Sequence, residues 1–327
     1  MPRAVSAKLS RVRQPAADAK TRNPLFNTQA YGQHILVNPG VCQAIVEKAN
    51  IKPHEKLLEV GPGTGNLSVL ILQKCKSLLA VEMDPRMAAE LQKRVQGKPE
   101  QRKLEVVVGD FVKADLPHFD VCISNTPYQI SSPLVFKLLS QRPLPRVCIL
   151  MFQREFALRL VARPGDNLWN RLSANAQLFA KIDHVLKVSK NSFRPPPNVE
   201  SSVVRIVPID PPPPVRFEEF DGLTRILFQR RNKTVRANFQ AKGVKDMLEA
   251  NYKAWLSSRP QPLVRVQAGD HVLADDVMGE GNDGVALVLE QILQDSGFSD
   301  RRPAKMDVDD FLSLLARFHS HGFHFGG

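Results

Sequence analysis

The chain has 327 residues, of which 43% are hydrophobic, and it carries a formal net charge of +12. This length leaves room for two domains with cores of their own, and the basic balance favours a polyanionic partner. No apolar run approaches the roughly 18 residues of a membrane-spanning helix, so the sequence predicts no membrane span. The four cysteines lie far apart and form no Cys-x-x-Cys pair, which predicts reduced, mostly buried thiols in an intracellular protein.

Residues 1–24 are basic and poor in apolar side chains. Their lysines and arginines stand against a single acid, Asp18, and Pro2, Pro15 and Pro24 discourage a continuous helix. A disordered arm on nucleic acid or a nuclear address is one interpretation, and a mitochondrial transit peptide is another. The prolines favour the arm.

A glycine-rich turn organises the chain that follows. It spans residues 59–66, Glu-Val-Gly-Pro-Gly-Thr-Gly-Asn, after an apolar run that predicts a strand and before one that predicts a helix. Glycines at 61, 63 and 65 let the backbone approach a ligand closely. A second apolar run ends at Glu82, whose carboxylate can accept hydrogen bonds from both ribose hydroxyls. The spacing differs from the dinucleotide motif Gly-x-Gly-x-x-Gly, so we expect S-adenosylmethionine; a purely structural turn is the alternative.

Strands and helices alternate after Glu82, which predicts a parallel sheet with ligand sites beyond the carboxyl ends of its strands. Further strands are expected at 104–108, 119–124 and 147–152. Gly61, Glu82, Asp110 and Asn125 all fall at such strand ends. Upstream, Gln33 and His34 either line the same pocket or form a capped surface turn.

The second half of the chain changes from strands to helices. We expect a helix at 167–180 and antiparallel closing strands at 183–188 and 201–207, with Phe193 in the loop between them. Four helices are expected beyond the proline-rich stretch, at 217–231, 233–255, 283–296 and 307–319. The sequence thus predicts an α/β, Rossmann-like S-adenosylmethionine-dependent methyltransferase domain followed by a smaller, mainly helical domain. The expected boundaries are a basic arm (1–24), a catalytic domain (25–208), a linker (209–216) and an RNA-binding domain (217–327).

The stretch Asn125-Thr126-Pro127-Tyr128 carries the predicted chemistry. The amino group of adenine is a poor nucleophile because its lone pair is delocalised into the ring. The Asn125 carbonyl and a backbone carbonyl can accept its two hydrogens, which localises the lone pair and aims it at a methyl group. Pro127 stiffens the backbone, Tyr128 offers a face for stacking, and Phe193 can supply the other face. The base must be unstacked or flipped to reach the pocket.

These residues together resemble the dimethyladenosine transferases, which methylate two adjacent adenines near the 3′ end of small-subunit ribosomal RNA. The resemblance covers nearly everything after residue 25, with matching stretches at 32–36, 59–66, 125–128, 191–204, 228–234 and 297–311. The C-terminal segment and the His-Ile-Leu at 34–36 resemble the eukaryotic nuclear and nucleolar branch of the family.

The resemblance implies a role for each matching residue. S-adenosylmethionine would be contacted by His34, Leu36, Gly61, Gly63, Glu82, Asp110 and Asn125. The target adenine would be held by Asn125, Pro127, Tyr128 and Phe193. Thr126 departs from the aliphatic residue of many members, at the variable position of the motif. The implied partners are small-subunit (18S) rRNA and the pre-ribosomal particle, for a monomer in the nucleus and nucleolus.

Two alternatives to this enzyme remain open. One is a non-catalytic RNA-binding ribosome-assembly factor of the same fold, and the other is a mitochondrial paralogue. The intact set of Glu82, Asp110 and Asn125 favours the enzyme.

A basic cluster and a group of histidines complete the candidate sites. Arg230, Lys233 and Arg236 recur three apart, which would align them on one helix face to bind RNA, with Arg231 beside them. A solvated helix face is the alternative. The histidines at 319, 321 and 324 lack the spacing of a helix pair, and no nearby cysteine or acid completes a set. The sequence therefore predicts no metal site.

Overall fold

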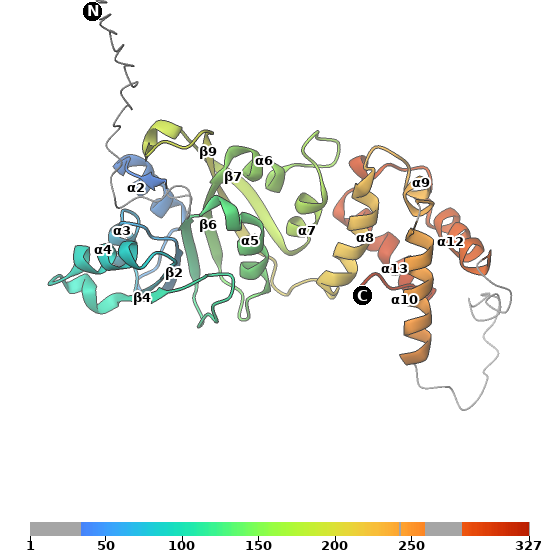
Figure 1. The fold of residues 1–327 in the computed structure, drawn as a ribbon, viewed down its shortest axis with the longest axis horizontal. Coiled ribbons are helices and arrows are strands. Elements are labelled where there is room, and N and C mark those ends of the chain that lie inside the picture. The colour runs from blue at the N-terminus through green and yellow to red at the C-terminus, as the bar shows by residue number, and fades with distance from the viewer. Residues whose placement is uncertain (1–33, 242, 259–282, 327) are drawn as a thin grey trace, which may run out of the picture.

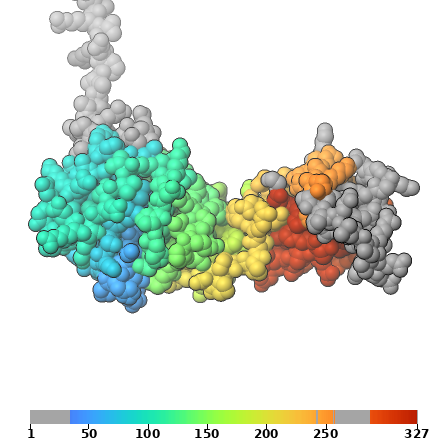
Figure 2. Space-filling view, turned by 90° about the horizontal axis from the view of Figure 1, so that it is seen from below, coloured from blue at the N-terminus to red at the C-terminus, as the bar shows by residue number. Residues whose placement is uncertain are grey.

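The structure, a computed structural model, describes residues 34–241, 243–258 and 283–326. The predictions for residues 1–24 and for Gln33 lie outside this range. Figure 1 shows a sheet-containing part and a helical part side by side along the long axis, and Figure 2 shows the narrower region between them. The α/β fold with a helical C-terminal region is confirmed.

A seven-stranded sheet forms the first part, in the order β4-β3-β2-β5-β6-β9-β7. Strands β2 to β6 are parallel, whereas β9 runs antiparallel to both β6 and β7. The predicted alternation is therefore confirmed, as is the antiparallel closing pair. The strands are β2 (Lys56–Val60), β3 (Ser77–Glu82), β4 (Leu104–Val108), β5 (Val121–Asn125), β6 (Val147–Gln153), β7 (Ala180–Val188) and β9 (Ser201–Pro208).

Helices cover both faces of this sheet, because successive residues of a buried strand point to opposite sides. Leu57 packs with helices α2, α3 and α4 in one apolar cluster, whereas its neighbour Leu58 packs with α5, α6 and α7 in another. These helices are α2 (Pro39–Lys48), α3 (Ser68–Leu72), α4 (Pro85–Val95), α5 (Ser131–Ser140), α6 (Arg154–Val161) and α7 (Arg171–Phe179). With helices on both faces of a mainly parallel sheet, a ligand can reach the sheet at the carboxyl ends of its strands.

The helical part has a third apolar cluster, to which the sheet-containing part contributes. Trp169 and Leu178 pack in this cluster with Phe220 and Phe311. Arg171 of α7 donates two hydrogen bonds to the buried carboxylate of Asp221 on α8. The helices of this part are α8 (Phe217–Gln229), α9 (Val235–Phe239), α10 (Val244–Ser258), α12 (Asp283–Ser296) and α13 (Val308–Ser320).

The secondary structure departs from the prediction in three places. The helix expected over 233–255 is two helices, because the chain turns between Phe239 and Val244 and Gly243 adopts a left-handed φ of +82°. The strand expected from residue 183 begins at Ala180, which shortens the preceding helix. Helix α5, directly after the Asn-x-Pro-Tyr stretch, was not predicted.

Strand β1 (Ile35–Leu36) pairs antiparallel with β8 (Phe193–Arg194), apart from the main sheet. None of the helices that the structure describes is both long and apolar enough to cross a membrane.

Candidate active site

A pocket lies at the carboxyl ends of β2, β3 and β5, where the sequence predicts it. Its walls come from the turn after each of these strands, from the turn after β4 and from the segment around β1. Nine predicted site residues line it: His34, Leu36, Gly61, Gly63, Glu82, Asp110, Asn125, Pro127 and Tyr128. Residues at one end of the sheet and residues of the segment around β1 therefore line the same cavity.

Two glycines of the glycine-rich turn, Gly61 and Gly63, lie close to neighbouring side chains. Gly61 has a φ of +64°, and a Cβ there would lie 3.1 Å from Cγ of Pro127. Gly63 has a φ of +56°, and a Cβ there would lie 2.9 Å from Cδ1 of Ile35. At both positions the left-handed backbone favours glycine, and a Cβ at either one would require a neighbouring side chain to shift. Their backbone is consequently exposed to a ligand in the pocket.

Glu82 is the last residue of β3 and is only 7% exposed. Its Oε2 accepts a hydrogen bond from the Gly63 amide at 3.0 Å, and its Oε1 accepts one from the Asp84 amide at 3.0 Å. Burial raises the pKa of this carboxyl, while these amides act in the opposite direction. Each carboxylate oxygen has a second lone pair, so the fixed group can still accept from two hydroxyls.

A second carboxyl in the pocket wall, Glu59, carried no predicted role. It is 1% exposed, and Oγ of Ser68 donates to its Oε2 at 2.6 Å. Burial raises the pKa of Glu59 to about 8. Near neutral pH it is therefore largely protonated, so the pocket does not hold two full negative charges at Glu59 and Glu82.

The turn after β4 is held by a lysine that no sequence signal identifies. Nζ of Lys137, on α5, donates to the carbonyl oxygens of Phe111 at 2.7 Å and Val112 at 3.0 Å. The same ammonium group lies 5.1 Å from the centre of the Phe111 ring. Asp110 precedes these residues, and its Oδ1 accepts from the Val112 amide at 2.9 Å. Lys137 thus fixes the turn that presents Asp110 and Phe111 to the pocket.

Asn125 ends β5, and its amide group has a defined orientation. Nδ2 of Asn125 donates to the backbone carbonyl of His34 at 3.1 Å. This bond uses the donor end of the amide and leaves Oδ1 as an acceptor. The predicted role, in which the Asn125 carbonyl accepts a hydrogen from an amino group, needs an acceptor at this position and stays a prediction.

An aromatic wall stands beside Asn125. The ring of Tyr128 is stacked with that of His34, with centres 6.2 Å apart and planes at 28°. The hydroxyl of Tyr128 hydrogen-bonds to Oγ of Ser201 at 2.8 Å, and burial raises the pKa of this phenol. The carbonyl of Pro127 accepts from the Ile130 amide at 3.1 Å, which fixes the backbone between Asn125 and Tyr128.

The segment around β1 covers one side of the pocket and is tied down at both ends. His34 hydrogen-bonds through Nδ1 to the Pro195 carbonyl at 2.9 Å. Nδ2 of Asn66 donates to the Leu36 carbonyl at 2.7 Å, and Oδ1 of Asn66 accepts from Arg94 at 2.6 Å. Asn66 therefore links the glycine-rich turn to the covering segment.

The structure places Phe193 differently from the other predicted residues. It is 2% exposed in the core below β1, opposite Leu36 in the β1–β8 pair, and it does not line the pocket. Its stacking on a base stays a prediction.

The basic cluster does not form one helix face, so that expectation is wrong. Helix α8 ends at Gln229 and α9 begins only at Val235. Arg230 donates to the Ala237 carbonyl, and Arg231 donates to the Trp169 carbonyl at 2.8 Å. Arg236 pairs with Glu290 at 2.9 Å, whereas Lys233 is exposed. The roles of these residues toward RNA stay predictions.

Comparison with known proteins now gives the family of this site. A family profile described as ribosomal RNA adenine dimethylase matches residues 25–270. The chain belongs to the ribosomal RNA adenine dimethylase family. The chain is accordingly an rRNA adenine N(6)-dimethyltransferase, which confirms the predicted enzyme class.

Relatives of this dimethylase match over almost its full length. It is 56% identical over 311 residues to a dimethyladenosine transferase from Schizosaccharomyces pombe, covering 95% of this chain and 96% of the relative. It is also 56% identical over 300 residues to the Saccharomyces cerevisiae dimethyladenosine transferase, covering 92% and 91%. A crystal structure of a Plasmodium falciparum dimethyladenosine transferase matches at 40% identity with a TM-score of 0.77, over 89% of this chain and all of that one.

Proposed function

We propose that this dimethylase uses S-adenosylmethionine to convert two adjacent adenosines, in a hairpin near the 3′ end of 18S rRNA, to N(6),N(6)-dimethyladenosine. The observation that carries the proposal is the orientation of Asn125. Its Nδ2 is bonded to the His34 carbonyl, so Oδ1 is left as a hydrogen-bond acceptor in the pocket. Such an acceptor suits an amino group that must be oriented rather than deprotonated beforehand.

The residues present fit S-adenosylmethionine. Its ribose would lie against Glu82, its adenine amino group against Asp110, and its remaining part along the backbone of Gly61 and Gly63. Both glycines line the pocket without a side chain between their backbone and the cavity, which supports this assignment. When bound, the cofactor supplies an electrophilic methyl group on a sulfonium.

The chain's own residues then orient the acceptor base. Oδ1 of Asn125 and a backbone carbonyl accept the two hydrogens of the adenine amino group. Tyr128, fixed through Ser201 and His34, offers its ring to the flipped base. After the first methylation one hydrogen remains on the nitrogen, so a single acceptor is enough to orient it for the second.

We further propose a role in small-subunit ribosome biogenesis, with 18S rRNA in the pre-ribosomal particle as the partner. A net charge of +12 supports a nucleic-acid partner. The fungal dimethyladenosine transferases, at 56% identity over more than nine-tenths of the chain, support the substrate class. We propose that the protein acts as a monomer in the nucleus and nucleolus, with cytoplasmic pre-ribosomes as a further site.

Depletion and complementation test this proposal in cells. Mass spectrometry of 18S rRNA should show loss of N(6),N(6)-dimethyladenosine after depletion. Wild-type protein should restore the modification, and Asn125→Ala should not. Unchanged modification after complete depletion would contradict the proposal and leave a non-catalytic assembly role. Imaging of the tagged protein distinguishes the nucleolar enzyme from a mitochondrial paralogue.

A further inference from the structure

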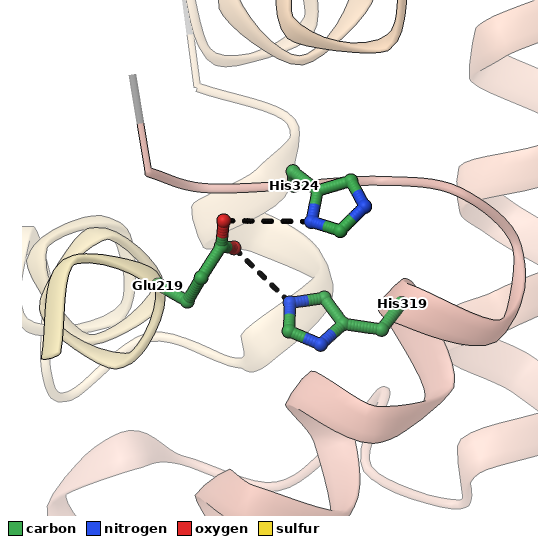
Figure 3. Close-up of side chains that lie close together, drawn as sticks. All are labelled: Glu219, His319 and His324. Carbon is green, nitrogen blue, oxygen red and sulfur yellow. Dashed lines mark hydrogen bonds and ion pairs between the residues drawn. The ribbon is translucent and has the colours of Figure 1, made fainter. Parts of the chain in front are cut away.

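A buried carboxylate and two histidines meet in the helical part, far from the active site in sequence. Glu219 comes from α8, His319 from the end of α13, and His324 from the C-terminal segment beyond it (Figure 3). No acid that could complete the set stands near these histidines in the sequence, because Glu219 lies 100 residues before His319. The fold supplies it.

The three side chains point possible ligand atoms toward one another. Nε2 of His319 lies 3.0 Å from Oε2 of Glu219, and Nδ1 of His324 lies 3.4 Å from Oε1 (Figure 3). All of these ligand atoms lie within 4.8 Å of one another. Zinc bonds of about 2.0–2.1 Å in a tetrahedron place neighbouring ligands about 3.3 Å apart. The two histidine–carboxylate separations, one to each carboxylate oxygen, lie near that spacing.

The charge balance of Glu219 also favours a cation. Its side chain is only 6% exposed, and among the described residues its ion-pair partners are these two histidines, with no lysine or arginine. Neither partner is a lysine or an arginine, the side chains that carry a permanent positive charge, so this buried carboxylate has no permanently charged partner among the described residues. A bound divalent cation would supply such a charge.

The surroundings hold the three groups in place. The backbone amide of Phe325 donates to Oε2 of Glu219 at 2.8 Å, and Asn251 donates to the His324 carbonyl at 2.9 Å. The ring centre of His324 lies 4.8 Å from that of His319 and 5.6 Å from that of Trp255. The histidine side chains are 30% and 32% exposed, so solvent can reach the site.

We propose that Glu219, His319 and His324 form a site for a divalent transition-metal ion, Zn²⁺ by its preference for imidazole and carboxylate, with water as the fourth ligand. The ion joins α8 to the end of α13 and to the C-terminal segment. The segment runs close to α8, since a Cβ on Gly222 would lie 2.4 Å from the Phe325 carbonyl oxygen. The site is independent of the methyl-transfer pocket.

The test separates a metal site from a cluster held by hydrogen bonds alone. His319→Gln and His324→Asn each keep a nitrogen donor near the position of the histidine nitrogen that faces Glu219, but remove a strong zinc ligand. His321→Asn is the matched control, because His321 contacts Ser320 and Arg317 rather than Glu219. Full-length proteins, stripped with a chelator and then freed of it, are titrated with ZnCl₂ by calorimetry.

Wild type and His321→Asn should each bind a single Zn²⁺ per chain, and the two cluster variants should bind at least about tenfold more weakly. Equal melting temperatures without metal would show that the variants are folded. Co²⁺ added to the wild type alone should give the intense visible absorption of a tetrahedral site, and Zn²⁺ should abolish it. No zinc binding by wild type, no Co²⁺ band, or equal zinc affinity in all four proteins would overturn the proposal and leave a hydrogen-bonded cluster.

Discussion

Replacing Glu82 tests how the pocket holds a nucleoside. In Glu82→Ala the ribose loses its proposed acceptor, and the amides of Gly63 and Asp84 lose theirs. A hydrogen bond to a charged group contributes about 1.5–3 kcal/mol. This range corresponds to roughly a tenfold to hundredfold rise in the Kd for S-adenosylmethionine.

The stability of Glu82→Ala is governed by two opposing effects. The two amides left without a partner destabilise the fold, whereas removal of a buried carboxyl with a raised pKa relieves a desolvation cost. We therefore expect a folded variant, to be verified by thermal unfolding.

Isothermal titration calorimetry measures the predicted loss of cofactor affinity. Glu105→Ala is the matched control, because it removes the same charge from the exposed face of the adjacent strand β4 and does not line the pocket. Its Kd should equal that of the wild type. An unchanged Kd in folded Glu82→Ala would refute the assignment of the ribose to Glu82.

Three further predictions follow from other residues. Burial raises the pKa of Glu59 from 4.5 to about 8, so the folded state binds more protons than the unfolded state between these values and stability falls as pH rises through them. The free energy of unfolding, measured with urea, should therefore depend less on pH for Glu59→Gln than for wild type. An equal pH dependence in the two proteins would contradict a raised pKa for Glu59. Lys137→Met should raise the Kd for S-adenosylmethionine while Lys137→Arg restores part of the affinity; equal affinities in all three proteins would show that the turn needs no ammonium group. Neutralising Arg230 and Lys233 together should flatten the slope of log RNA affinity against log salt by about 1.5, at 0.7–0.9 per phosphate contact. Fluorescence anisotropy over a salt series measures this slope. Equal slopes for wild type and the double variant would show that Arg230 and Lys233 are solvated surface residues that do not contact RNA.

The sheet and its ligand-binding edge were predictable because their signals are local. Short apolar runs mark the strands, and Glu82 and Asn125 stand where two of those runs end. Parallel strands bring such ends together whatever the distance in sequence. The strand-end part of the pocket therefore followed from residue order, whereas the contribution of His34 and Leu36 was expected only from the family resemblance.

The features that the sequence did not reveal depend on tertiary contacts. The left-handed backbone at Gly243 breaks a helix whose apolar periodicity continues on both sides. Arg231 and Arg236 resemble a free basic face until Trp169 and Glu290 are placed against them. Burial of Phe193 follows from the pairing of two short strands, which no local pattern indicates.

Methylation by purified protein tests the central claim most directly. The full chain, S-adenosylmethionine and an RNA hairpin with the 3′-end sequence of 18S rRNA are combined, and the digested RNA is analysed by mass spectrometry. We predict N(6),N(6)-dimethyladenosine at two adjacent positions with wild-type protein. Asn125→Ala should bind the RNA nearly as well but lose most of the product, because the Asn125 contact acts chiefly in the transition state. Near-wild-type turnover by Asn125→Ala at saturating cofactor, or no dimethyladenosine with wild type, would contradict the account.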